Sequence, residues 1–148
     1  MFEGLEQKSL EGIIKFCKKA DNSDAIMARL ERTWKTGFDF GSGRIDNEYL
    51  IGLNKMRTKV IPLGSVVWAY MYTASLNGGV VRVDLTVGYN TRKLDSCVLD
   101  NAAIVRILDY ITKNCPDIAV GHSKEADKFF RKRNMEALKE YARAQRSK

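Results

Sequence analysis

The chain has 148 residues, of which 45% are hydrophobic and 29% are charged, and its net charge is +7. This composition excludes a disordered chain, and a compact domain of this length buries about 68–70% of its unfolded surface. The longest apolar run, Val66–Tyr72, is far shorter than the roughly 20 residues that span a bilayer, and acidic residues interrupt the N-terminal segment where a signal peptide would be apolar. We therefore expect a soluble, cytoplasmic protein with one domain-sized core.

Residues 1–36 are predicted to form a pair of helices. Apolar residues recur there with the spacing i, i+3, i+4, which places them on one face of each helix. The first face is Leu10, Ile13, Ile14 and Cys17, and the second is Ile26, Met27, Leu30 and Trp34. The polar segment 21–24 separates the two helices and offers an N-cap to the second.

Residues 37–99 are predicted to form about six to seven short strands, because apolar residues there alternate with polar ones. Asn54-Lys55 is a plausible two-residue turn, and Pro62 marks a strand end or an edge strand. Asn77-Gly78 predicts a tight hairpin, since both central residues of a type I′ turn need positive φ. In the strand that follows, we expect Arg82, Asp84 and Thr86 to occupy a solvated face. Short turns join the strands, so the sheet should be antiparallel.

Two more helical segments follow the strands. Asp100 is the predicted N-cap of a helix over 100–114, and the segment 117–148 is predicted to carry one basic helix that starts at Ser123. Strands grouped between helices indicate the α+β class. The predicted architecture is a bent antiparallel sheet or partial barrel over 37–116, closed by the helix 100–114.

This order is that of a pleckstrin-homology-like (PH-like) domain, and four segments carry a direct resemblance. The region from Glu48 to Gly121 resembles small uncharacterised bacterial proteins with a PH-like domain. The matching segments are Glu48–Ile51, Val60–Leu63, Val66–Tyr70 and Ile107–Ile111. The resemblance implies a domain that binds phosphoinositides, peptides or proteins, and it implies no enzyme.

The residues themselves predict no catalytic centre, no metal and no cofactor. Three widely spaced cysteines, Cys17, Cys97 and Cys115, match neither a disulfide framework nor a zinc site. The one histidine, His122, stands beside a helix start without ligand-spaced partners. Asp46 shares a strand face with another carboxylate, but charged residues ordinarily occupy the polar face of such a strand.

Trp68, Tyr70 and Tyr72 are the candidate partner-binding residues. Their i, i+2, i+4 spacing places them on one face of a strand whose other face is also apolar. The simpler interpretation is that the two N-terminal helices cover the aromatic face. The alternative is an aromatic groove for a peptide or protein, because Trp and Tyr supply binding hot spots.

Basic residues gather at two places that could bind anions. Arg57 and Lys59 share a face of the predicted strand after the Asn54-Lys55 turn, where lipid-binding PH domains carry an anion site. Residues 121–148 carry nine Lys or Arg and four Asp or Glu side chains, so +5 of the net charge lies there. The densest part of this tail is Lys128, Arg131, Lys132 and Arg133.

The sequence therefore predicts a non-catalytic binding module whose partner is a protein or peptide. The alternative is an electrostatic binder of anionic membrane or nucleic acid that uses the basic tail. Association of identical copies through an exposed sheet edge also stays open.

Overall fold

The computed structural model describes residues 2–54 and 57–147, so Lys55 of the predicted turn lies outside the described residues. The chain forms two compact units, Met1–Gly64 and Ser65–Lys148. The boundary between them falls in a 3₁₀ turn, Leu63–Ser65, inside the segment 37–116 that was predicted as one domain.

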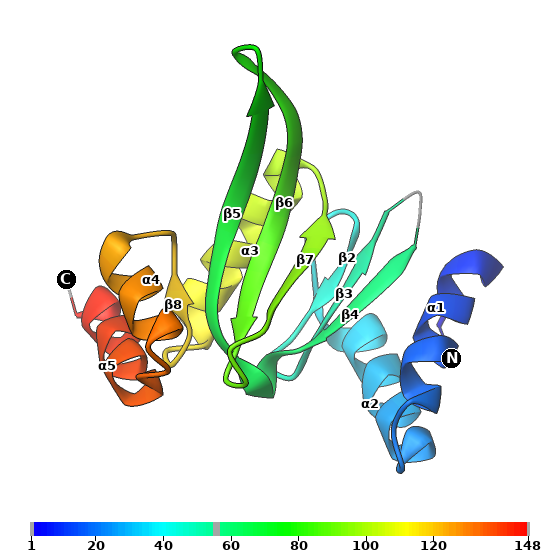
Figure 1. Ribbon diagram of the computed structural model, residues 1–148. Coiled ribbons are helices and arrows are strands. Elements are labelled where there is room, and N and C mark those ends of the chain that lie inside the picture. The colour runs from blue at the N-terminus through cyan, green and yellow to red at the C-terminus, as the bar shows by residue number, and fades with distance from the viewer. Residues whose placement is uncertain (1, 55–56, 148) are drawn as a thin grey trace. The chain divides into compact units, whose positions relative to one another are not determined.

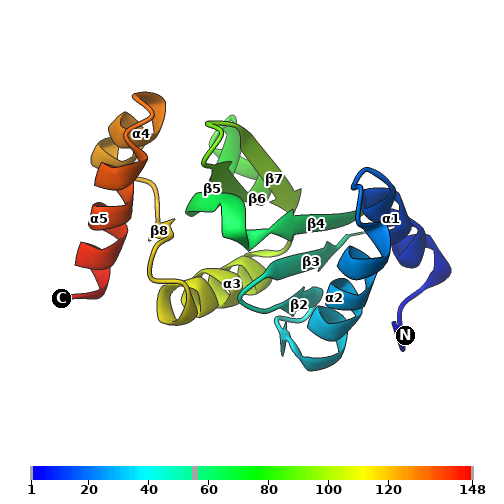
Figure 2. The same ribbon diagram turned by 90° about the horizontal axis from the view of Figure 1, so that it is seen from below.

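The first unit is a helical pair on a four-stranded antiparallel sheet, with strand order β1-β2-β3-β4 (Figure 2). Its elements are α1 (Gln7–Lys18), α2 (Ser23–Thr36), β1 (Phe38–Asp39), β2 (Gly43–Ile45), β3 (Tyr49–Leu53) and β4 (Thr58–Pro62). Ile13 and Leu30 of the helices pack with Ile51 and Val60 of the sheet in one buried cluster. The predicted helical pair is confirmed, and Ile13, Cys17, Leu30 and Trp34 of its predicted apolar faces are buried, whereas Leu10 and Ile14 are only partly buried.

Asp46 organises the turn between β2 and β3. Its Oδ1 accepts hydrogen bonds from the backbone N–H groups of Glu48 and Tyr49, each at 2.9 Å. Its Oδ2 accepts a hydrogen bond of 2.7 Å from the buried Thr33 hydroxyl of α2. The carboxylate therefore joins a helix to the sheet, which accounts for an acidic residue at this strand end.

The second unit contains a four-stranded sheet, one helix along it and two C-terminal helices (Figure 1). Its elements are β5 (Val66–Leu76), β6 (Gly79–Tyr89), β7 (Leu94–Val98), α3 (Asn101–Asn114), β8 (Ala119–Val120), α4 (Lys124–Arg131) and α5 (Met135–Arg146). The strand order is β7-β6-β5-β8, with β8 parallel to β5. Asn77 and Gly78 have φ values of 51° and 81°, which confirms the predicted hairpin turn.

The class is α+β, as predicted, but the strands form two four-stranded sheets in place of one bent sheet, and neither sheet is closed. Pro62 supplies a physical reason for the break. It ends β4 at the edge of the first sheet, where proline, lacking an N–H, cannot donate to a further strand. The 3₁₀ turn follows at once, and β5 pairs with β6 and β8.

The predicted single C-terminal helix is also wrong, because the segment 117–148 holds β8 and two helices. Ser123 caps α4 as expected, accepting a hydrogen bond from the Ala126 N–H. Arg133, with φ of 57°, then takes the left-handed conformation that ends helices, and the side chain of Asn134 caps α5.

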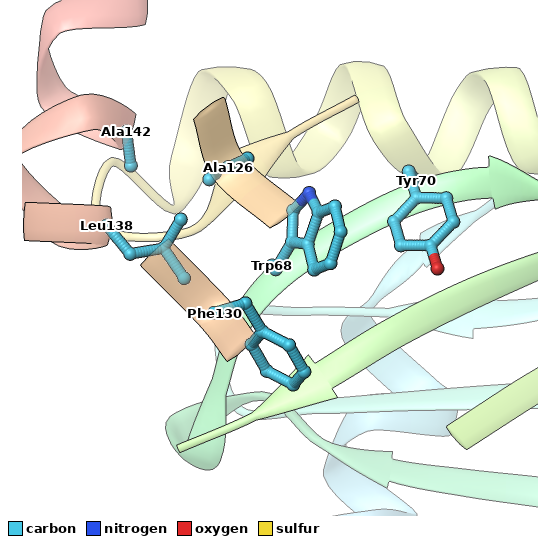
Figure 3. Packing of buried hydrophobic residues seen from close by; sticks show 7 residues of the cluster. Trp68, Tyr70, Ala126, Phe130, Leu138 and Ala142 are labelled. Carbon is cyan, nitrogen blue, oxygen red and sulfur yellow. The ribbon is translucent and has the colours of Figure 1, made fainter. Parts of the chain in front are cut away.

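Trp68 is the centre of the C-terminal packing. It is 1% exposed, and its indole N–H donates a 2.9 Å hydrogen bond to the carbonyl of Gly121. The Phe130 ring lies 5.4 Å from it, and Leu138 of α5 completes the cluster (Figure 3). The elements that cover Trp68 are thus α4 and α5, which corrects the interpretation that the N-terminal helices do so.

The outer edge of β8 is closed by a side chain. The Gln145 amide of α5 accepts a hydrogen bond from the Val120 N–H at 3.0 Å and donates one of 2.8 Å to the Val120 carbonyl. It thereby mimics the pairing of a further strand. At Val120 this edge is not available to a partner strand.

Gly88 is the position where this packing predicts the sharpest cost of substitution. A Cβ there would lie 2.6 Å from Cε1 of Phe130, well inside van der Waals contact. We expect Gly88→Ala to lower the free energy of unfolding by about 1–3 kcal/mol, because the ring must move. Chemical denaturation measures this loss.

Gly79→Ala is the matched control, since a Cβ at Gly79 meets the Leu76 carbonyl oxygen at an ordinary 3.7 Å. Equal stability losses for the two variants would contradict the account of the Phe130 contact.

A candidate binding groove on the second sheet

A groove of about 410 Å³ opens on the face of the second sheet that carries Tyr70 and Tyr72. Side chains from β5, β6 and β7 line it. We call it the Tyr72 groove, and its lining residues are Tyr70, Tyr72, Arg82, Asp84, Thr86, Leu94, Asp95 and Ser96.

Strand register brings most of these side chains together. Tyr70 pairs with Thr86 and Tyr72 with Asp84 across β5 and β6, and Thr86 pairs with Ser96 across β6 and β7. Cross-strand partners project on the same face of a sheet, so residues from three strands converge. The groove thus depends on the hairpin at Asn77-Gly78 being in this register.

Exposure changes steeply along the aromatic strand. Trp68 is covered by the C-terminal helices, Tyr70 is 8% exposed, and Tyr72 is 47% exposed. Leu94 of β7 is a second large apolar side chain that reaches solvent at the groove. The groove therefore has a closed end near Trp68 and an open apolar rim.

Asp84 lies at the floor and is 1% exposed. Its Oδ1 accepts a short hydrogen bond of 2.6 Å from the hydroxyl of Thr86. Its Oδ2 lies 3.0 Å from Nη2 of Arg82, but no donor in the described chain is aligned for a hydrogen bond to this oxygen. Asp84 is thus a buried carboxylate with one oxygen only loosely engaged.

Tyr70 and Tyr89 are held as neutral phenols. Burial, followed by the nearby carboxylates of Asp127 and Asp84, raises the pKa of Tyr70 above its ordinary value. Burial and the hydrogen bond from its hydroxyl to Asp95 also raise the pKa of Tyr89. Both side chains therefore remain uncharged over the physiological pH range.

Of the predicted partner-binding residues, Tyr70 and Tyr72 line the groove and Trp68 does not. Trp68 instead supports its closed end, where the exposed His122 ring lies 5.6 Å from the indole and 5.2 Å from Tyr70.

The polar floor was not foreseen as a site. Arg82, Asp84 and Thr86 alternate with apolar residues, and this pattern predicted a solvated face. Asp84 and Thr86 are instead buried, because tyrosines of β5 and the side chains of β7 flank them. The signal in the sequence is a carboxylate opposite an aromatic residue, which is recognisable only once the strand register is known.

The predicted anion-binding residues fall at two separate places. Arg57 is exposed and directly precedes β4, and its backbone N–H donates a hydrogen bond to the Asn54 side chain, while Lys59 lies within β4. On α4, Arg131 pairs with Asp127 at 2.9 Å. The remaining tail candidates are exposed and make no ion pair within the described chain: Lys128, Lys132 and Arg133.

Other cations of the tail serve the fold. Asp117 binds Arg143 at 2.8 Å and Lys139 at 3.8 Å, and the Arg143 hydrogen bond lowers the pKa of this carboxyl. Arg146 donates hydrogen bonds to carbonyls at the end of α3, including that of Cys115 at 2.9 Å. Part of the basic character of α5 is thus committed to internal contacts.

Cys17, Cys97 and Cys115 form no disulfide, and the first two are buried while Cys115 is partly exposed. Burial raises the pKa of the Cys17 thiol. Within residues 2–54 and 57–147, no group of three or more His, Cys, Asp or Glu side chains is placed to hold a metal ion. No helix in these ranges is long and apolar enough to cross a membrane.

These features define a small α+β protein with an open groove on one sheet. The chain belongs to the family described as domain of unknown function DUF6709, whose model matches residues 7–130. The match spans both compact units and includes every residue of the Tyr72 groove. Comparison with curated proteins and with solved structures finds no match.

The state of Asp84 yields a stability prediction. A buried carboxylate that lacks a full set of hydrogen bonds opposes folding, because its desolvation is not fully offset. We expect Asp84→Asn to leave the free energy of unfolding unchanged or to raise it, since the amide oxygen still accepts from Thr86. Thermal and chemical unfolding of the purified variant measure this.

Asp46→Asn is the comparison, because Asp46 accepts three hydrogen bonds. The free energy of unfolding of this variant should fall by about 1–2 kcal/mol. A fall of more than about 1 kcal/mol in the free energy of unfolding of Asp84→Asn would contradict the prediction and show that the Asp84 carboxylate stabilises the fold.

Proposed function

We propose that the protein is a non-catalytic binding module that holds a segment of a partner protein in the Tyr72 groove. The observation that carries the proposal is the half-exposed Tyr72 beside the exposed Leu94, on the rim of an open groove with a polar floor. Pockets that bind ligands combine apolar walls with a few polar groups of this kind. Tyrosine supplies contact area at low conformational cost, which makes it a common anchor for peptides.

A binding role agrees with how the polar groups of the groove are engaged. The Thr86 hydroxyl is turned to Asp84, and Asp84 is paired with Arg82. The PH-like relationship and a cytoplasmic location are part of this proposal. The PH-like relationship is supported by the order of the elements, because α3 directly follows antiparallel strands, as the closing helix of a PH-like domain does.

A random-peptide library displayed on phage and selected on the full-length protein tests this function. We expect selected peptides to bind at least about tenfold more weakly to Tyr72→Ala and to Leu94→Ala, because each variant removes an apolar wall of the groove. Isothermal titration of synthetic peptides measures the change.

Val105→Ala is the matched control, since Val105 is an exposed apolar residue of α3 that does not line the groove. The proposal fails if no peptide is selected, or if the selected peptides bind all three variants as they bind the parent protein.

A second candidate function is supported by exposed cations at the C-terminal end of α4. Lys128 lies in the last turn of this helix, Lys132 and Arg133 follow it directly, and all three side chains are exposed to solvent. Such a cluster attracts polyanions with an affinity that falls as salt rises. We infer a weaker, sequence-independent interaction there with anionic membrane or nucleic acid.

Deletion of the tail is not a clean test, because Phe130 and Leu138 belong to the buried cluster around Trp68. The triple variant Lys128→Gln, Lys132→Gln, Arg133→Gln keeps that cluster. We expect it to lose most of the binding to phosphatidylserine vesicles or to single-stranded DNA at low salt, measured by cosedimentation and fluorescence anisotropy.

The control variant Lys15→Gln, Lys18→Gln, Lys19→Gln removes the same charge from exposed positions at the end of α1. Equal losses in both triple variants would mean that net charge alone attracts the polyanion.

A further inference from the structure

The loosely engaged oxygen of Asp84 points to the chemistry of the ligand. A carboxylate offers about four acceptor positions, and buried carboxylates usually fill them. At Asp84, Thr86 fills one position on Oδ1, whereas Oδ2 has the Arg82 contact without hydrogen-bond alignment. Oδ2 is buried at the floor of the groove beneath the Arg82 contact, so a donor from a ligand reaches it only if Arg82 moves away.

Arg82 is a weak internal partner for this anion. Its side chain is 53% exposed, and it lies on the part of the β5–β6 hairpin that extends beyond β7 (Figure 1). Holding a long, half-exposed side chain in one geometry costs rotamer entropy, and such ion pairs contribute little. A ligand cation can thus displace the Arg82 guanidinium, because moving this half-exposed group into water costs little free energy.

The walls of the groove suit a basic side chain. Tyr70 and Tyr72 flank Asp84 on the neighbouring strand, and the faces of phenol rings attract cations. Leu94 offers apolar surface for the aliphatic stem that carries the charge of Arg or Lys. The groove therefore has surfaces for both parts of such a side chain.

Local charge favours the same ligand. Asp84 and Asp95 line the groove against the one cation of the lining, Arg82. Asp127 of α4 adds no net charge nearby, because it is paired with Arg131, which acts on the pKa of Tyr70 in the opposite direction. The chain as a whole carries +7, so its general field favours acidic partners. A preference for a basic residue would have to arise from the groove itself.

We propose that the Tyr72 groove binds a partner segment through one arginine or lysine side chain that pairs with Asp84 and replaces Arg82. This inference rests on the proposed function, because it specifies which residue of the bound segment enters the groove. The bound cation takes the place of Arg82 at Oδ2 of Asp84, with Tyr70 and Tyr72 beside it.

A double-mutant cycle on library-selected peptides tests the inference. We expect these peptides to be enriched in Arg or Lys at one position. Replacing that residue by a neutral isostere, citrulline for Arg or norleucine for Lys, should weaken binding to the parent protein at least about tenfold. The same replacement should have little effect on binding to Asp84→Asn, because the charge that it pairs with is gone.

Asp109→Asn is the matched control, an identical change at an exposed carboxylate of α3 that pairs with Lys113. The neutral replacement should weaken peptide binding to Asp109→Asn by the same factor as it weakens binding to the parent protein. Arg82→Gln should bind the basic peptide at least as tightly as the parent protein does, since the internal competitor is removed.

Two results would overturn the inference. The first is a set of peptides that depend on Tyr72 and Leu94 but show no enriched basic residue, which would leave the proposed function standing. The second is that the neutral replacement weakens peptide binding to the parent protein and to Asp84→Asn by the same factor. Failure to select any peptide that depends on Tyr72 would instead overturn the proposed function together with the inference.

Discussion

The packing of Trp68 against Phe130 is the interaction on which the second unit depends. The indole N–H is held by the Gly121 carbonyl, and the Phe130 ring occupies the space left by the missing side chain of Gly88. These contacts fix α4 and α5 over one end of the sheet face, as Figure 3 shows for their buried residues. Because the cover ends near Tyr70, the rest of that face is left open.

The aromatic residues of β5 thus have different roles at different points along the strand. Trp68 is structural, Tyr70 is a buried wall, and Tyr72 is an accessible rim. The buried Asp84, opposite Tyr72 in the register, adds charge to an otherwise apolar surface. Such a group costs stability unless it is compensated, and Thr86 and Arg82 supply only part of that compensation.

Local features of this fold could be predicted from the sequence because their causes are local. The apolar spacing of residues 10–17 and 26–34 gave the two N-terminal helices, and Asn77-Gly78 marked the hairpin through its need for positive φ. The caps at Asp100 and Ser123 were recognisable from their side-chain acceptors. In each case the determining contacts lie within a few residues.

Long-range features could not be predicted in the same way. The separation into two sheets depends on where β5 finds its partners, and β8 joins it from about fifty residues further along the chain. The prediction of the site had the same limit. The sequence pattern predicted a solvated Asp84, and only the structure shows that β7 and Tyr72 lie beside it. The cover of Trp68 was assigned to the wrong helices because an apolar helix face does not specify its partner surface.

The central claim is that the Tyr72 groove is the binding surface, and amide chemical-shift mapping tests it most directly. The measurement is a titration of the isotope-labelled full-length protein with a library-selected peptide, followed by two-dimensional NMR. The account predicts that the largest shifts fall on Tyr72, Asp84 and Ser96 and on their immediate neighbours. Shifts concentrated on α4 at Lys128–Arg133 or within the first unit, with the groove amides unmoved, would contradict it.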